Sequence, residues 1–223
     1  RGLRLPTLNE LYRPFVVFPV VTQANADLRN ERLLGSEAGL DWQPAAGISL
    51  GVTVFDNEVQ DAIANVTLAP NLRQRQNLPA IRARGVEATL SATRGAFGLE
   101  GSLAWTDAEV RGEGASLPLD GLRPAQTPRL AGSASVSWKP APGWLISTTL
   151  RHIGAQAEDD FNVDFLPAAT TIGAYAQVPL SGKLALVLRG ENLTGETVVT
   201  RNSGGSIDLG TPRTLWAGLR WGY

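Results

Sequence analysis

The feature that most constrains the fold is a repeated alternation of apolar and polar residues. The last stretch, Arg213 to Tyr223, shows it clearly, because Leu215, Ala217, Leu219 and Trp221 occupy every second position. Successive side chains of a β-strand point to opposite faces, so the stretch predicts a strand with one apolar and one polar face. A half-buried strand of a soluble protein and a strand of a membrane barrel both have this pattern.

The connections between the alternating segments separate these two alternatives. The alternation predicts nine strands, over residues 33–42, 48–66, 86–92, 97–106, 130–138, 144–151, 170–178, 184–191 and 214–223. Short connections around Pro44, Arg94, Pro140 and Ser181 alternate with long ones around Asn71, Gly114, Asp159 and Gly204. Soluble sandwiches have irregular connections, whereas membrane barrels have short periplasmic turns and long outer loops. The sequence therefore predicts an all-β, antiparallel transmembrane β-barrel.

Aromatic and charged residues follow the same division of faces. The aromatic residues of the apolar face that lie near short turns or the C-terminus are Trp42, Phe97, Trp138, Trp144 and Trp221. Such rings favour the level of the lipid headgroups. The charged residues predicted on the opposite face, toward the lumen, are Glu37, Asp41, Glu87, Glu100, Arg129, Arg151, Lys183, Arg189, Glu191 and Arg220.

Composition limits the remaining function classes. The 223 residues carry a formal net charge of -1 and no cysteine, so neither a nucleic-acid-binding field nor a thiolate metal site is expected. The longest uncharged runs, Phe15 to Ala26 and Leu166 to Gly182, contain proline or many polar residues and do not predict membrane helices. The chain starts at Arg1 without a signal peptide, and we interpret it as part of a longer protein.

The first 31 residues lack the alternation. Thr7 followed by Glu10 resembles a capping box and predicts a helical turn over Leu8 to Tyr12. Phe15 to Val21 is apolar but flanked or interrupted by Pro14 and Pro19, and we expect a partly ordered loop there.

Several motifs, taken in order, resemble those of TonB-dependent outer-membrane receptors. Residues 2–12 (GLRLPTLNELY) resemble the family's "FRAPTLNELY" box, and residues 25–31 with 37–40 resemble the stretch that follows it. Asn77 with Gly85-Val86-Glu87 is similar to the family's "N…GVE" strand. The segments 120–124, 127–129, 159–162 and 191–193 and the aromatic end also fit. The resemblance covers essentially the whole chain, although no single motif is specific.

The resemblance implies a fold and a function. It implies that residues 1–223 are the C-terminal portion of the receptor barrel, the last nine of a probable 22 strands, without the plug domain and first strands. It also implies that the protein is a receptor and not an enzyme. The receptor would lie in the outer membrane of a Gram-negative bacterium and, with energy supplied through TonB, would take up a scarce nutrient such as a ferric siderophore. Membrane lipid, lipopolysaccharide and the TonB complex are the expected partners. The alternatives are a passive porin or a barrel without a plug, a barrel that carries an additional enzymatic domain, and a soluble binding sandwich.

Exposed polar groups in the long loops are the candidate ligand-binding residues. They are Tyr12, Arg13, Arg73, Arg75, Arg123 and Arg201, which could meet an anionic ligand; arginine binds carboxylate or catecholate oxygens through paired N–H groups. Alternatively, these arginines pair with loop acids or lipopolysaccharide phosphates. Arg73 and Arg75 lie two residues apart, so both side chains of a strand would point the same way. Trp221 and Tyr223 are the candidate residues for barrel closure and assembly.

Other chemistry is not predicted. His152, the sole histidine, lies on the apolar face and is interpreted as an interfacial residue rather than a metal or haem ligand. Asp159 and Asp160 could bind calcium, but adjacent loop acids are usually solvated. No nucleophile elbow is present, and no cofactor, metal site or catalytic residue is expected.

Overall fold

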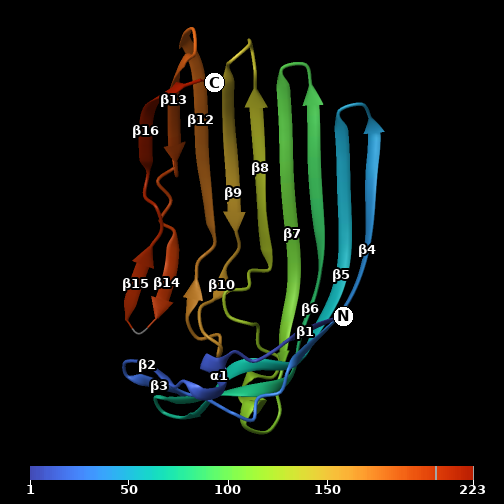
Figure 1. Ribbon diagram of the computed structural model, residues 1–223, viewed down its shortest axis with the longest axis vertical. Helices are drawn as coiled ribbons and strands as arrows, with labels where there is room; N and C mark the ends of the chain where they lie inside the picture. Colours follow the sequence, from blue (N-terminus) through green and yellow to red (C-terminus); the bar gives the residue numbers. More distant parts are fainter. Residues whose placement is uncertain (204, 223) are drawn as a thin grey trace.

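A single long antiparallel sheet organises the molecule in the computed structural model, which describes residues 1–203 and 205–222 (Figure 1). Twelve strands belong to this sheet, and its main path runs β1-β4-β5-β6-β7-β8-β9-β12-β13-β16. The strands of this path are β1 (Gly2–Arg4), β4 (Glu31–Ala45), β5 (Ile48–Ala69), β6 (Leu72–Arg94), β7 (Phe97–Arg111), β8 (Leu130–Trp138), β9 (Leu145–Ile153), β12 (Ala169–Ser181), β13 (Leu184–Glu191) and β16 (Thr214–Trp221).

All nine predicted strands are confirmed, and these nine follow one another across the sheet in chain order, from β4 to β16. The short turns lie together at one end of the sheet, called the turn end, and the connections predicted to be long lie at the other, called the loop end (Figure 1). The prediction of a long connection around Asn71 is wrong, because β5 and β6 extend to a turn at residues 70 and 71. Glycine permits the tight turns: Gly47 has a φ of +78°, and a Cβ there would lie 2.6 Å from the Thr93 carbonyl oxygen.

The register joins the apolar residues of successive strands into rows on one face. Leu50 pairs with Leu90, Leu90 with Gly101, and Gly101 with Ala134. Near the turn end, Phe97 pairs with Trp138, and their rings stack with centroids 6.1 Å apart. The predicted apolar face is thus continuous across the sheet, and the aromatic residues line its turn-end margin.

The sheet is a partial barrel with two open edges. The last strand, β16, pairs only with β13 among the described residues, and Trp221 lies opposite Leu184 at that edge. At the other edge, β1 covers only the start of β4, at Glu31 to Leu33. Unpaired strand edges are not viable in a bilayer, so the transmembrane barrel that the sequence predicts would need further strands at both edges. The role of Trp221 in closure and assembly stays a prediction, and Tyr223 lies outside the described residues.

The polar face carries most of the charged side chains predicted there. Glu37, Glu87, Glu100 and Arg189 alternate with apolar-face residues in the observed register. Arg129 is the exception, because it precedes β8 and its guanidinium lies 3.6 Å from Asp107. Asp107 follows Trp105 by two residues in β7 and therefore shares its face. The prediction that Arg129 faces the lumen is wrong for this reason.

The first 31 residues are more ordered than expected. The predicted helical turn is confirmed as α1 (Leu8–Tyr12), and Thr7 and Glu10 form the expected capping box. The prediction of a loop over Phe15 to Val21 is wrong, because β2 (Phe15–Val17) and β3 (Val20–Gln23) form a hairpin around Pro19. The hairpin adds to the tip of β6, where β3 pairs in parallel, so long-range pairing supplies the order that the local sequence does not indicate.

Candidate functional site: a cap at the loop end

Two strands extend far beyond the others and supply the frame of the loop end. β5 and β6 have 22 and 23 residues, whereas β8 and β9 have 9 each. A membrane strand needs about 9–11 residues, so β5 and β6 are each about twice as long as a membrane crossing requires. Asp61 has a φ of +53° and, like Pro79, falls between the paired residues Gln60–Ala80 and Ala62–Leu78; proline cannot donate a backbone hydrogen bond. The β5–β6 hairpin bends over at the loop end (Figure 1).

The bent tip is covered on both faces. We call the tip (61–79), α1, β2, β3, the 3-10 helix η1 (Gly114–Leu119) and the loop 158–164 the cap. On one face, Arg75 of β6 donates to the carbonyl of Asn9 in α1 at 2.6 Å and stacks over the Phe15 ring of β2 at 5.0 Å. The other face forms the buried core, whose members are Ala62, Val66, Leu78, Val110 and Leu119, with Phe161 packed against it.

Two asparagines fasten the N-terminal segment to the hairpin. The Asn77 amide donates to the Arg29 carbonyl at 3.1 Å and to the Asp61 carbonyl at 2.6 Å, and its oxygen accepts from the Arg29 N–H at 2.8 Å. The Asn25 amide donates to the Arg75 carbonyl at 3.0 Å. Asn77 therefore gives a partner to the Asp61 carbonyl at the bend and to both backbone groups of Arg29 in the N-terminal segment.

A charged network joins β1, α1 and β4 beside the bend. Arg4 pairs with both Glu10 and Glu31, and Glu31 also accepts from the Ile63 N–H at 2.7 Å. The hydrogen bond from Arg4 lowers the pKa of Glu31, with the Ile63 N–H acting in the same direction against burial. Burial tends to raise the pKa of Glu10, but hydrogen bonds from Thr7 and Arg4 lower it on balance. Both carboxylates are thus held in the charged form.

The loops after β7 and β9 are held together in the same manner. Asn162 accepts from the Arg123 N–H at 3.0 Å and donates to the Arg123 carbonyl at 2.9 Å. The Asp159 carboxylate accepts from the backbone N–H groups of Phe161, Val163 and Asp164. The expectation that this acidic loop is merely solvated is wrong for Asp159. Burial raises the pKa of Asp160, whose carboxyl lies within the field of Arg73.

The structure brings four of the six predicted ligand residues together. Tyr12 and Arg13 end α1, and the Arg13 N–H and the Arg75 guanidinium donate to the same Asn9 carbonyl. Arg73 pairs with Thr22 on the same strand as Arg75, so both arginines share the predicted face. Their role in ligand binding stays a prediction.

The other two predicted residues lie apart. Arg123 donates to the Thr106 carbonyl at 3.1 Å, and burial lowers its pKa, with Arg129 acting in the same direction. Arg201 belongs to a separate hairpin, β14 (Val199–Ser203) with β15 (Ser206–Leu209), and lies 3.7 Å from Asp208. Arg201 therefore pairs with a loop acid, which is one of the alternatives to ligand binding that the sequence left open.

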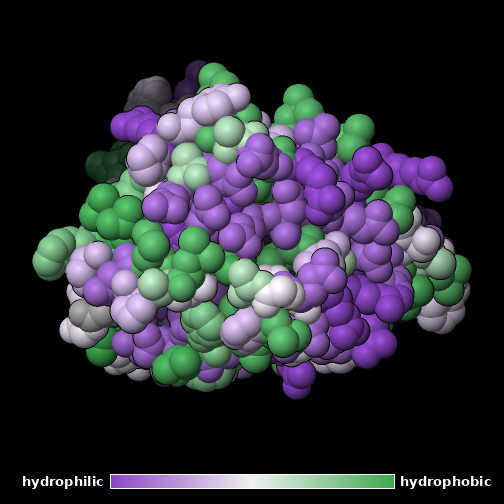
Figure 2. All heavy atoms as spheres, turned by 90° about the horizontal axis from the view of Figure 1, so that it is seen from below, coloured by the Kyte–Doolittle hydropathy of each residue, from purple (hydrophilic) through white to green (hydrophobic). Residues whose placement is uncertain are grey.

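Sequence reasoning did not assign roles to Asn25, Asn77, Glu31 and Arg4, which hold the cap in place. All four lie in the motifs on which the family resemblance rests, and their place in these motifs is the only sequence feature that sets them apart. Figure 2 looks onto the loop end, where hydrophilic side chains cover much of the centre and right of the surface. A polar surface over a small buried core is suited to polar ligands and to solvent.

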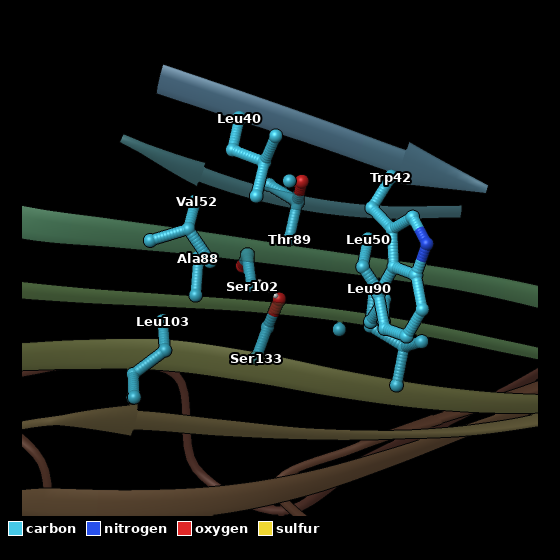
Figure 3. A pocket seen from close by; sticks show the side chains of 12 residues that line it. Leu40, Trp42, Leu50, Val52, Ala88, Thr89, Leu90, Ser102, Leu103 and Ser133 are labelled. Atoms are coloured by element: carbon cyan, nitrogen blue, oxygen red, sulfur yellow. Dashed lines mark hydrogen bonds between the residues drawn. The ribbon is translucent and has the colours of Figure 1, made fainter. Parts of the chain in front are cut away.

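The apolar face also contains a shallow hollow of about 400 Å³ (Figure 3). Leu40, Trp42, Leu50 and Val52 border it where Gly101 leaves space. This hollow lies on the apolar face of the sheet and is not part of the cap. In the described part of the chain, no group of three or more acidic, histidine or cysteine side chains could hold a metal ion. Within residues 1–203 and 205–222, no helix is long and apolar enough to cross a membrane.

Comparison with known proteins gives a family and a fold. The model of the family described as "TonB dependent receptor-like, beta-barrel" matches residues 1–193. The copper transporter OprC superposes with a TM-score of 0.76 at 15% identity, over 100% of this chain and 36% of OprC. The siderophore receptor PiuA of Acinetobacter baumannii gives 0.70 at 16% identity, over 87% of this chain and 28% of PiuA.

The ferric yersiniabactin uptake receptor FyuA of Yersinia pestis gives a TM-score of 0.73 at 16% identity, over 86% of this chain and 30% of FyuA. The chain thus spans about a third of the length of the solved proteins that it matches. At this level of identity the structural likeness establishes the fold.

Proposed function

This chain belongs to the family of TonB-dependent receptor β-barrels, and from that premise we propose that the whole protein takes up a scarce nutrient, such as a ferric siderophore, across the outer membrane of a Gram-negative bacterium. In this proposal TonB supplies the energy, through a plug and energy-coupling segment outside residues 1–223. These residues are the C-terminal portion of the barrel, in contact with membrane lipid and lipopolysaccharide. The protein binds and releases its ligand without covalent chemistry.

The observation that carries the proposal is the cap. A passive pore does not require a folded layer at its mouth, yet here α1, β2 and β3 pack on a bent hairpin and are fixed by Asn25, Asn77 and Glu31. Such a layer can hold cations in fixed positions, which reduces the ordering cost of binding a ligand. The names of FyuA and PiuA support ferric chelates as the first ligands to test.

The test of capture is equilibrium binding of iron-loaded catecholate and hydroxamate chelates to the purified full-length receptor. For an anionic ligand, Arg73→Ala with Arg75→Ala should weaken binding by about 1.5–3 kcal/mol per lost charge-assisted hydrogen bond. Arg73→Ala is measured alone as well, because Arg75 also anchors α1. Arg94→Ala, at a turn-end connection, is the control. A change below about 0.5 kcal/mol would leave the two arginines as ordinary loop surface.

The energy dependence of uptake distinguishes the proposed receptor from a passive porin. Uptake of the radioactive ferric chelate should stop in cells treated with a protonophore if TonB supplies the energy. Uptake that continues unchanged would favour the porin, since diffusion needs no proton gradient.

A further inference from the structure

The turn end carries charge of one sign. Its four connections, taken with the strand residues beside them, are residues 43–48, 94–97, 138–145 and 180–184. They contain three cations, Arg94, Lys139 and Lys183, and no acidic residue. All three side chains are exposed, and in the described part of the chain none of them belongs to an ion pair. At the loop end, by contrast, several arginines pair with acids. The turn end is thus a positively charged rim.

Arg94 lies at the margin of the apolar face, beside the stacked aromatic rings. It pairs with Phe97, and Phe97 pairs with Trp138, so the three side chains form one row on one face. Aromatic rings at such a margin mark the headgroup level of a bilayer. The next turn is adjacent, because the Lys139 N–H donates to the Ala96 carbonyl at 2.8 Å. Two neighbouring turns therefore each supply a cation at the level of the lipid phosphates.

The hollow of about 400 Å³ lies two rows deeper on the same face (Figure 3). Leu90, four residues before Arg94 in β6, lines it together with Gly101. At about 3.3 Å per residue, the hollow lies about 13 Å from the Arg94 backbone, which is within reach of a lipid acyl chain. Packing does not require glycine at position 101, since an added Cβ would meet no atom closer than 3.7 Å. A larger residue there would instead fill the hollow.

We propose that this part of the turn end binds an anionic glycerophospholipid, with its phosphate at Arg94 and Lys139 and one acyl chain in the hollow. Guanidinium groups bind phosphate oxygens through paired N–H donors, and exposed cations beside a membrane attract anionic lipids. In the orientation expected from the short turns, this lipid belongs to the periplasmic leaflet. The inference rests on the outer-membrane location in the proposed function, but it requires neither a siderophore nor TonB.

The test is native mass spectrometry of the purified full-length receptor in detergent, titrated with dioleoylphosphatidylglycerol. Arg94→Gln with Lys139→Gln should weaken binding about tenfold, the loss expected for one charge-assisted hydrogen bond. Lys183→Gln is the matched control and should leave binding unchanged. Lys183 is also an exposed turn-end cation, but it belongs to the connection between β12 and β13, which does not line the hollow.

A second variant tests the place of the acyl chain. Gly101→Leu should fill the hollow and weaken binding about fourfold, the effect of one methylene that is no longer buried. Ala217→Leu is its control, because Ala217 pairs with Leu188 on the apolar face but does not line the hollow. Heat-modifiable migration in electrophoresis shows that each variant is folded.

Any of four results would overturn the proposal. The first two are equal binding by the double variant and the native receptor, and an equal loss in Lys183→Gln. The third is unchanged binding in folded Gly101→Leu. The fourth is equal competition by zwitterionic dioleoylphosphatidylcholine, by glycerol phosphate or by soluble peptidoglycan fragments, which would mean that the rim does not select an anionic lipid. Failure of chelate uptake would refute the proposed function and leave this binding result unaffected.

Discussion

The main sheet between the turn end and the cap, which we call the wall, shares its hairpins with the cap. The two regions are nevertheless held together differently. In the wall, apolar rows such as Leu50, Leu90 and Gly101 repeat from strand to strand, and backbone hydrogen bonds join the neighbouring strands. In the cap, single polar side chains such as Asn77 and Glu31 bind backbone groups at the bend. The wall therefore depends on a repeated pattern, whereas the cap depends on a few particular residues.

This difference has a functional side. The repeated wall tolerates exchange of one apolar residue for another, because no single side chain defines its register. The cap uses conformations that a repeat cannot supply, including the positive φ of Asp61 and the parallel pairing of β3 with β6. Binding residues are commonly placed on irregular segments that a rigid scaffold supports.

The largest expected effect is a difference in stability between the same substitution on the two faces of the wall. Leu90→Arg places a charge on the apolar face and should lower the free energy of unfolding by about 2–4 kcal/mol. Thr89→Arg, one residue earlier, places the same charge on the polar face and should cost far less. Folded protein in the outer membrane and urea unfolding in lipid measure both variants. Equal losses, or a larger loss for Thr89→Arg, would refute the face assignment.

A smaller effect should be confined to the cap. Asn77→Ala removes the hydrogen bonds to Arg29 and Asp61 and should favour local opening by about 1–3 kcal/mol, the cost of leaving backbone groups unsatisfied. Hydrogen exchange of residues 72–78 should accelerate, while exchange in β8 and β9 stays unchanged. Asn57→Ala, in the wall part of β5, is the matched control. Uniform acceleration across the sheet would mean that the cap and the wall open as one unit.

The smallest effect is the response of the cap to acid. Glu10 and Glu31 have pKa values below their usual 4.5, so their contribution is complete above that pH and is lost as pH falls through the lowered values. Asp160 acts in the opposite sense, because its raised pKa means that protonation relieves a cost of burial. Proteolysis of the cap between neutral pH and pH 3 should increase in acid, and Glu31→Gln should reduce this increase. An identical response in Glu31→Gln would exclude Glu31 as its cause.

The sequence predicts the wall well and the cap poorly, for a physical reason. Alternation and turn residues are local, so they are sufficient for all nine strands and for the helical turn that Thr7 caps. The β2–β3 hairpin depends on pairing with β6, some 50 residues away in the sequence. Arg129 was assigned to the wrong face because the alternation does not extend into the loop before β8.

The candidate site shows the same limit. The shared face of Arg73 and Arg75 follows from strand geometry alone, whereas the contact of Arg75 with Asn9 and Phe15 requires the fold. The motif residues Asn25 and Asn77 indicated a family without indicating what their side chains bind. Polar side chains that bind distant backbone groups have no period in the sequence.

Impermeant thiol labelling of intact cells tests the central claim most directly, since the claim is that the cap faces the outside and the turn end faces the periplasm. Residues 1–223 contain no cysteine, and labelling of the parent protein without an introduced cysteine is the background control. Ala115→Cys, exposed at the loop end, should react, while Ala141→Cys, exposed at a turn-end connection, should react only after the outer membrane is permeabilised. Labelling of Ala141→Cys in intact cells, with Ala115→Cys protected, would contradict the account.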